Sequence, residues 1–188
     1  SEYTEQALVR LSEVYLKNKE YGKAIPVLQR LEKEANYPQN VTYAESNLMK
    51  SYYEEKNFSE AVVYAQKVLT KEKSTPDAKK EGEIIVARSA IKTGDFERGK
   101  LAYAKMTGAK GELGAEVLYY EAYFKNKEGK FEDSNKTIQK LAKDFSGYKY
   151  YGAKSLIVMA DNFYKLNDTF QATYVLETVI KNFTTFPD

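Results

Sequence analysis

Carboxylates are the side chains of this sequence that could do acid–base chemistry, because it contains neither histidine nor cysteine. Two close pairs, Glu54-Glu55 and Glu81 with Glu83, are candidates for a shared proton or a bound cation. Residues one or two positions apart on a helix point in different directions. Nothing in the surrounding sequence indicates the burial that would raise a carboxyl pKa. We therefore interpret both pairs as solvated helix faces.

Two other stretches have a composition that could bind phosphate, and neither has the necessary pattern. Gly108–Gly111 lacks the G-x4-G-K-[ST] spacing and the preceding strand of a phosphate-binding loop. The basic stretch Lys71–Lys80 is interrupted by Glu72 and Asp77, which is unlike a nucleic-acid-binding tract. Without cysteine or histidine there is no thiolate nucleophile and no Cys/His metal site. The sequence therefore predicts a protein that is not an enzyme and uses no cofactor or metal.

The overall charge of the chain is too small to produce a strong electrostatic field around the protein. The 188 residues include 29 basic and 27 acidic side chains, for a formal net charge of +2. No apolar run approaches the roughly 20 residues that span a bilayer. These features exclude nucleic acid as the expected partner and a direct membrane span, and they favour a protein or peptide partner.

The most regular pattern is a pair of amphipathic helices at Leu156–Phe183, joined at Asn167-Asp168. The helical spacing of apolar residues predicts one buried face on each helix. The predicted buried residues of the two helices are Leu156, Met159, Ala160 and Phe163, then Ala172, Leu176, Val179 and Phe183. Neither helix can bury its face alone, so the pair is expected to pack against others.

The same arrangement recurs through the chain. A small residue returns every 35 to 38 positions, at Ala24, Ala61, Gly99, Ser134 and Ala172. An aromatic residue stands three positions before the first four of these, and Thr169 takes its place before Ala172. This periodicity predicts five repeats at approximately 5–38, 42–75, 76–110, 112–147 and 149–183, within a single domain covering 1–188.

The repeats resemble the tetratricopeptide repeat (TPR), a helix–turn–helix unit of about 34 residues. In the first repeat, Leu8, Leu11 and Tyr15 are expected to form the inner stripe of the first helix, Ala24 to let the second helix approach, and Pro38 to end the unit. Pro26 lies early in the second helix and should bend it without breaking it. The resemblance implies an all-α, right-handed α-solenoid of about five repeats and ten main helices. Another two-helix solenoid or an irregular bundle is the alternative.

A narrower resemblance lies in the fourth and fifth repeats. Asp144-Phe145-Ser146, Tyr150-Tyr151, Ala153-Lys154, Ala160–Phe163 and Asn167–Ala172 are similar to repeats of bacterial cell-envelope TPR proteins. That group includes outer-membrane assembly lipoproteins and periplasmic partners of the Tol-Pal system. Ser146 departs from the proline usual in that family. The resemblance implies a scaffold in the bacterial periplasm or cell envelope; the cytoplasm is the alternative.

In TPR proteins the first helix of each repeat lines a concave groove that binds partners. By register, the resemblance carries those groove positions onto Val9, Glu13, Leu16, Lys17, Tyr43, Ser46, Lys50, Tyr53, Glu54, Glu81, Ile84, Arg88, Ile91, Lys92, Leu118, Ala122, Lys125, Ile157, Asp161, Tyr164 and Lys165. The candidates for partner contact are Tyr43, Lys50, Tyr53, Arg88, Lys92, Lys125, Asp161, Tyr164 and Lys165. A groove of mixed sign suits a peptide held by aromatic rings and backbone hydrogen bonds.

Two features of the groove limit the kinds of partner that it could bind. Val9 and Glu13 occupy positions where chaperone-binding TPRs carry Lys and Asn, so the carboxylate clamp of those proteins is absent. Tyr53, Arg88 and Lys92 form a predicted central patch, since tyrosine and arginine are enriched at binding hot spots. The alternative is that Tyr53 packs against the next repeat and the two cations lie on a solvated face.

Two functional hypotheses follow. The first is a protein-interaction scaffold, because a solenoid presents a long binding surface. The second is a structural or regulatory arm of a larger protein that contacts its own flanking domains. No polar capping helix follows Phe183, and Val175, Val179, Ile180 and Phe183 are predicted to face outward. We therefore expect a segment of a longer protein, or self-association through the last helix. The glycines of Thr107–Gly114 predict a short helix before them and a flexible joint.

Overall fold

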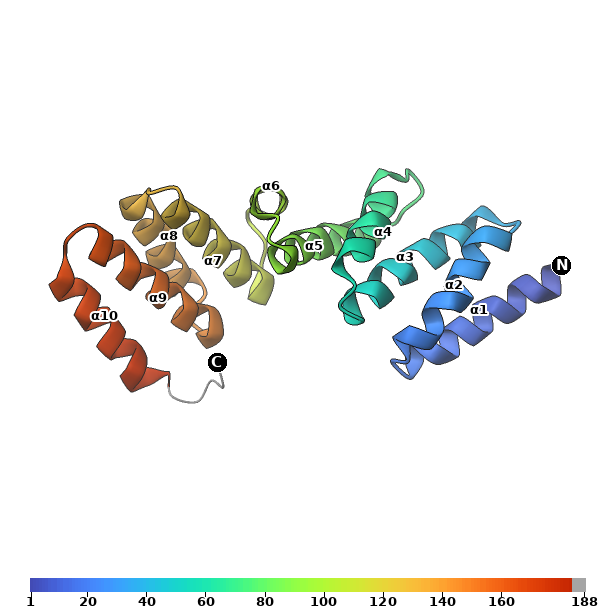
Figure 1. The fold of residues 1–188 in the computed structure, drawn as a ribbon, viewed down its shortest axis with the longest axis horizontal. Coiled ribbons are helices and arrows are strands. Elements are labelled where there is room, and N and C mark those ends of the chain that lie inside the picture. Colours follow the sequence, from blue (N-terminus) through green and yellow to red (C-terminus); the bar gives the residue numbers. More distant parts are fainter. Residues whose placement is uncertain (184–188) are drawn as a thin grey trace. The chain divides into compact units, whose positions relative to one another are not determined.

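A computed structural model describes residues 1–183 of the chain. Among these residues there are ten α-helices and no strand, which confirms the predicted all-α fold of five helix pairs (Figure 1). In chain order the helices are α1 (Glu2–Lys17), α2 (Tyr21–Glu34), α3 (Pro38–Glu54), α4 (Phe58–Thr70), α5 (Pro76–Thr93), α6 (Phe96–Ala104), α7 (Gly111–Lys127), α8 (Phe131–Asp144), α9 (Lys149–Lys165) and α10 (Thr169–Asn182).

The residue that begins each second helix is the one that the repeat pattern singled out. Second helices begin at Tyr21, Phe58, Phe96, Phe131 and Thr169, three positions before the recurring small residue. The short residue permits close approach: a Cβ on Gly99 would lie 2.9 Å from Ile91 Cδ1. Pro26 lies inside α2, which continues past it, because early in a helix proline forfeits few hydrogen bonds. As predicted, α6 is short, with 9 residues.

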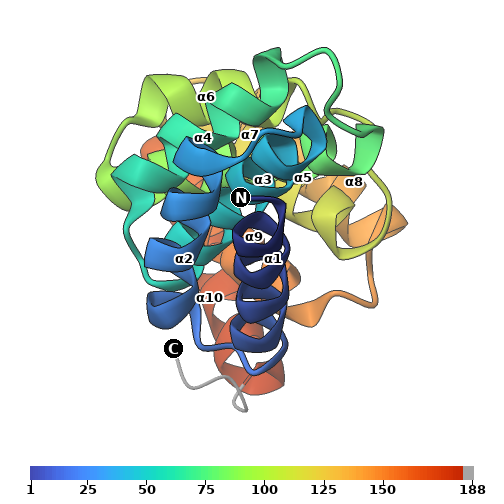
Figure 2. The ribbon, with the colours of Figure 1, turned by 90° about the vertical axis from the view of Figure 1, so that its right-hand side faces the viewer.

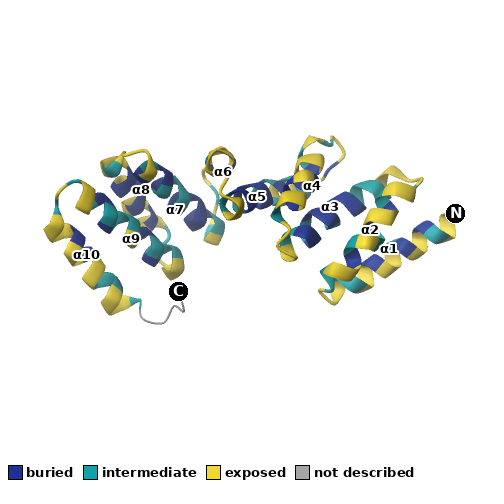
Figure 3. Ribbon diagram, viewed as in Figure 1, coloured by how far each residue is buried: buried dark blue, intermediate teal, exposed yellow. Residues whose placement is uncertain are grey.

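The helices divide into two compact units, Ser1–Ala102 and Tyr103–Asp188, and each is described by itself. In the first unit, α1 and α2 lie side by side, and each later helix through α5 packs against the one before it (Figure 2). Its core contains the fully buried side chains of Leu28, Leu31, Leu48, Met49 and Val68. In the second unit, α7 packs against both α8 and α9, and α9 packs against α10. Its buried residues lie on the facing sides of these helices (Figure 3).

Two details of the predicted core are wrong. Leu11 is 42% exposed, because Leu8 and Ser12 already fill the contact between α1 and its neighbours. In α10, Leu176 is 44% exposed while Val175, expected to face outward, is buried. The helix is therefore rotated by about one residue from the predicted face. Ala172 is buried as predicted, and Ile180 is exposed as predicted.

One position that the sequence analysis did not single out repeats in all five first helices. Ser12, Ser51, Ser89, Asn126 and Asn162 occur at intervals of 36 to 39 residues, and all are buried. The serines are small enough for the second helix to approach. The two asparagines form a hydrogen-bonded group instead: Asn126 Nδ2 donates to Asn162 Oδ1 over 2.7 Å, and Asn162 Nδ2 donates to Ser134 Oγ over 2.8 Å.

Candidate functional site

A groove of about 400 Å³ lies between α3 and α5 in the first unit. Its lining residues are Lys50, Tyr53, Glu54, Asp77, Lys80, Glu81, Ile84, Ile85 and Arg88. Both walls are first helices of neighbouring repeats, which contact each other directly. Proline at the first position of each helix fixes where these walls begin, at Pro38 and Pro76. The groove therefore follows from the repeat pattern itself.

The apolar part of the groove is formed by Ile84, Ile85 and the ring of Tyr53. The Tyr53 ring is held by an edge contact with Phe58, with ring centroids 5.7 Å apart. Ile85 is buried, while Tyr53 and Ile84 are half-buried and accessible. A partly exposed, fixed aromatic ring beside aliphatic side chains can hold an apolar side chain with little loss of conformational freedom.

The charged part of the groove is balanced. Its three cations are Lys50, Lys80 and Arg88, and its three anions are Glu54, Asp77 and Glu81. Lys50 Nζ lies 2.8 Å from a carboxylate oxygen of Glu81, which ties the two walls together across the groove. Both side chains are about two-fifths exposed, so this ion pair contributes little to stability. Its larger effect is to orient the charges that a partner would meet.

Of the nine candidate residues, Lys50, Tyr53 and Arg88 line this groove together. Lys92 is exposed and does not belong to the groove lining, so the predicted patch of Tyr53, Arg88 and Lys92 is only partly assembled. Tyr43 lies elsewhere, with its hydroxyl 3.1 Å from Ser12 Oγ. Burial raises the pKa of Tyr43 above its ordinary value. Tyr43 therefore serves the contact between the first two repeats.

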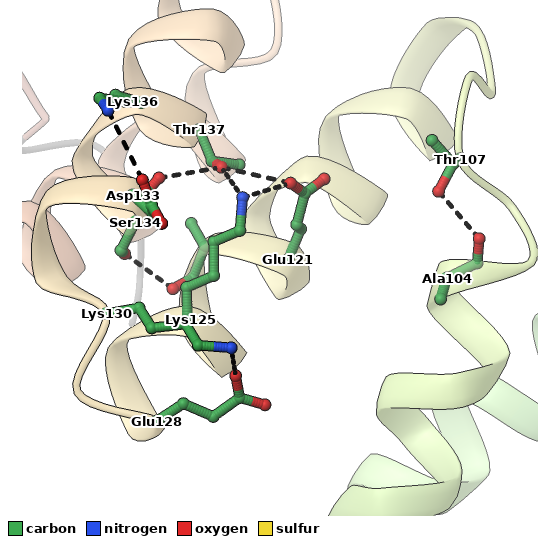
Figure 4. A network of polar contacts seen from close by, with 11 residues as sticks. Ala104, Thr107, Glu121, Lys125, Glu128, Lys130, Asp133, Ser134, Lys136 and Thr137 are labelled. Atoms are coloured by element: carbon green, nitrogen blue, oxygen red, sulfur yellow. Dashed lines mark hydrogen bonds and ion pairs between the residues drawn. The ribbon is translucent and has the colours of Figure 1, made fainter.

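The remaining candidates belong to the second unit, where they are largely engaged with their own neighbours. Lys125 Nζ donates to Glu121 over 2.7 Å and to Thr137 Oγ1 over 2.9 Å (Figure 4). Asp161 accepts from Asn126 Nδ2 over 2.7 Å, and Lys165 lies 3.5 Å from it. Tyr164 is 65% exposed. Leu118 and Ala122, which register placed in the groove, are instead buried.

Sequence reasoning missed Asp77, Lys80 and Ile85. Register from the family's groove positions began at Glu81 in this helix. The available signal was Pro76, because proline marks the first turn of a helix and so places Asp77 and Lys80 on it. Glu54 and Glu55 are exposed, as interpreted from the sequence, whereas Glu81 and Glu83 are half-buried and Glu81 pairs with Lys50. Within the described part of the chain, no group of three or more acidic side chains could hold a metal ion, and no helix is long and apolar enough to cross a membrane.

Several solved structures have an arrangement of helices similar to that of this chain. The chain superposes on MamA of AMB-1 with a TM-score of 0.73 at 9% identity, over 99% of this chain and 95% of that one. A putative kinesin light chain from Podosopora anserina, described as having nearly identical TPR-like repeats, gives a TM-score of 0.59 at 14% identity, over 94% of this chain and 93% of that one. A point variant of that kinesin light chain gives 0.60 at 14% identity, covering 96% of both chains.

The fold is a TPR-type α-solenoid. No family model matches the chain, and no curated protein matches it. Because the structural identities are 9% and 14%, these likenesses concern the fold alone. In a TPR solenoid the first helices line the groove, and the α3–α5 groove lies on such helices. Self-association through α10 stays a prediction, which the mass of the chain in solution would test.

Proposed function

We propose that this protein is a non-enzymatic interaction scaffold that binds a linear peptide of a partner protein in the α3–α5 groove. The observation that supports it best is the convergence, from two adjacent first helices, of a fixed tyrosine ring, two isoleucines and balanced charges. A solenoid exposes such a surface without needing a catalytic centre. The lack of histidine and cysteine leaves no ordinary general base or thiol nucleophile for a reaction.

The chemistry of the groove indicates what kind of peptide it would take. The apolar floor at Ile84 and Ile85 suits one aliphatic or aromatic anchor side chain. Cations and anions are equal in number, so a strongly acidic or strongly basic tail would gain no net attraction. A peptide with one charge of each sign beside the anchor would meet opposite charges on both walls, which favours correct register over other sequences.

Peptide selection from a random display library on the wild-type protein tests this proposal. Selected peptides should lose roughly tenfold or more in affinity for Tyr53→Ala and for Arg88→Glu, since truncated hot-spot residues commonly cost over about 1.4 kcal/mol. Lys33→Glu is the matched control, because Lys33 is exposed on α2 and does not line the groove. Arg88→Glu and Lys33→Glu should keep the wild-type melting temperature, while Tyr53→Ala, which loses the contact with Phe58, should melt lower but remain folded at the temperature of the binding measurement. Peptides that bind Arg88→Glu and Tyr53→Ala as tightly as wild type would exclude this groove.

We further propose that the scaffold works in the bacterial periplasm or cell envelope. The support is the resemblance of 144–172 to envelope TPR proteins; the fold itself is common to other compartments. Fractionation of the source cells with an antibody against this chain tests it. Recovery of the protein with the cytoplasmic fraction alone would overturn the envelope location while leaving the peptide-binding proposal intact.

A further inference from the structure

A second groove, of about 420 Å³, lies in the second unit among α8, α9 and the end of α10. Its apolar side chains are Ile138, Leu141, Ala142, Phe145, Leu156 and Phe183, and it also contains Ser146, Lys149, Gly152, Ser155 and Asn182. Two of its walls are second helices, whereas the α3–α5 groove uses first helices only. Concave, mainly apolar sites of this size with a few polar groups are typical of small-ligand pockets.

At the equivalent place in the first unit, charged side chains bridge α2, α3 and α4. Leu28 and Leu31 lie seven and ten residues after the start of α2, as Ile138 and Leu141 do after the start of α8. One residue further, α2 carries Glu32, which accepts from Tyr64 Oη over 2.8 Å and pairs with Lys67 over 2.7 Å. The corresponding residue of α8 is Ala142, which is too short for such a bridge.

A second bridging contact of the first unit is also replaced. Six residues before the buried Ser51 of α3 stands Glu45, which pairs with Lys71 just after α4. Six residues before Asn162 in α9 stands Leu156, and the residue just after α10 is Phe183. Charged side chains bridge the helices at two positions of the first unit, and apolar residues of the groove stand at both positions in the second. At the first position the shorter Ala142 leaves space, and at the second Leu156 and Phe183 replace an ion pair with apolar surface.

The interior of the groove is shaped by residues without bulk. Gly152 lines it, and a Cβ built there meets no heavy atom within 4 Å, so space is open above the α9 backbone. Ser155 is 1% exposed, and its hydroxyl has no hydrogen-bond partner among the described residues. Gly152 and Ser155 therefore leave this wall of the groove without a bulky side chain.

The charge of the groove lining indicates which polar group a ligand would carry. Lys149 carries the single charged side chain among the described residues that line the groove, and it is exposed. An apolar body in the groove with one anionic head beside Lys149 would match both the lining and the charge. We propose that this groove binds a small amphipathic carboxylate, with its hydrocarbon part between α8 and α10 and its carboxylate at Lys149. The site is separate from the proposed peptide groove and does not depend on it.

Decanoate, titrated into the full chain by calorimetry or by NMR, is the probe, and 1-decanol is its uncharged counterpart. Decanoate should bind wild type more tightly than 1-decanol does. Gly152→Leu fills the groove and should lower decanoate affinity at least tenfold. Lys149→Glu should weaken decanoate by about two- to fivefold, since exposed ion pairs are weak, and leave 1-decanol unchanged.

The controls change the same residue types outside the groove. Gly147→Leu alters an exposed glycine before α9, and Lys143→Glu alters an exposed lysine of α8; neither residue lines the groove. Both should bind decanoate as wild type does. Gly152→Leu should stay folded because leucine favours helix over glycine, and a circular dichroism melt checks this. Absence of decanoate binding to wild type, or equal loss in the two leucine variants, would overturn the proposal.

Discussion

Glu5 of α1 caps the start of α3 in the next repeat. Its carboxylate accepts from Asn40 Nδ2 over 2.7 Å and from the backbone N–H groups of Asn36 and Tyr37 over 3.0 and 3.2 Å. Tyr37, the N-cap of α3, offers no side-chain cap of its own. A buried carboxylate from the preceding repeat therefore does what a capping residue ordinarily does locally, and it joins the two repeats.

Replacing Glu5 should make the stability of the protein depend less on pH in the acidic range. The hydrogen bond from Asn40, opposed by burial and aided by the two backbone donors, holds the pKa of Glu5 below its ordinary value. A lowered folded pKa contributes stability that is present above the unfolded pKa and is lost as pH falls through the folded one. Glu5→Gln should therefore melt at a lower temperature than wild type at pH 7, with the difference narrowing below about pH 4.

Thermal melts from pH 7 to pH 3 measure this difference. Glu72→Gln is the control, since Glu72 is exposed in the turn after α4 and should change the melting temperature little at any pH. A constant gap between wild type and Glu5→Gln across the whole pH range would show that the cap acts through packing and not through the charge of the carboxylate.

Asn162 should be among the most sensitive positions of the second unit. Its amide donates to Ser134 Oγ and Asn135 Oδ1, both over 2.8 Å, while its oxygen accepts from Asn126. The side chain is fully buried. Asn162→Ala removes three hydrogen bonds inside the fold and leaves a cavity, and we expect a loss of about 2–4 kcal/mol in the free energy of unfolding. Urea denaturation of the variant measures it.

The matched comparison for Asn162→Ala is Ser51→Ala. Ser51 holds the same repeat position in α3, and its buried hydroxyl has no hydrogen-bond partner among the described residues. Removing an unsatisfied hydroxyl should be neutral or slightly stabilising. If both variants lose the same stability, the asparagine group contributes only by filling volume.

The repeat arrangement could be read from the sequence, and the reason is geometric. The position of Ala24 and its equivalents must be small for two helices to approach, and the aromatic three residues earlier begins each second helix. Such constraints act within one repeat, so one sequence shows them five times. The rotation of α10, by contrast, depends on which neighbour covers it. The helical period allows either Leu176 or Val175 to face the core. The prediction that Leu176 does so was wrong, because Val175 is the buried residue.

The groove was predictable only in part for a similar physical cause. Register places Tyr53 and Arg88 on first helices correctly, because side-chain direction follows from helical period. Whether a side chain is accessible depends on contacts between helices. Lys125 has the groove position but is held by Glu121 and Thr137. The open groove at Gly152 also required the structure, since the charged residues that bridge the equivalent helices of the first unit come from different helices.

Gly114 gives a sharp test of how the segment before α7 packs. A Cβ on Gly114 would lie 2.4 Å from the carbonyl oxygen of Ala109 and 2.5 Å from the Phe145 ring. The first of these atoms is backbone and cannot move aside without shifting the turn that precedes α7. We expect Gly114→Ala to lower the free energy of unfolding by about 1–3 kcal/mol, despite the better helix propensity of alanine.

Gly152→Ala provides the opposite case on α9, because a Cβ there meets no heavy atom within 4 Å. Helix propensity alone should then raise stability by up to about 1 kcal/mol. Urea denaturation of the two variants should shift the midpoint in opposite directions. Equal stabilisation by both alanines would mean that the turn at Ala109 is free to move away from α7.

The predicted flexible joint at Thr107–Gly114 can be tested by limited proteolysis. The division between the two compact units falls just before it, within α6, and exposed Lys105 and Lys110 offer trypsin sites on either side of Thr107. Proteases cut first where backbone can leave its local structure at low cost. Trypsin at low ratio should therefore cleave at these lysines before those of α8, such as Lys140 and Lys143.

Replacing Gly108 by alanine should not protect the site, because its positive φ of 87° strains any residue with a side chain. First cleavage inside a helix of either unit would contradict the joint.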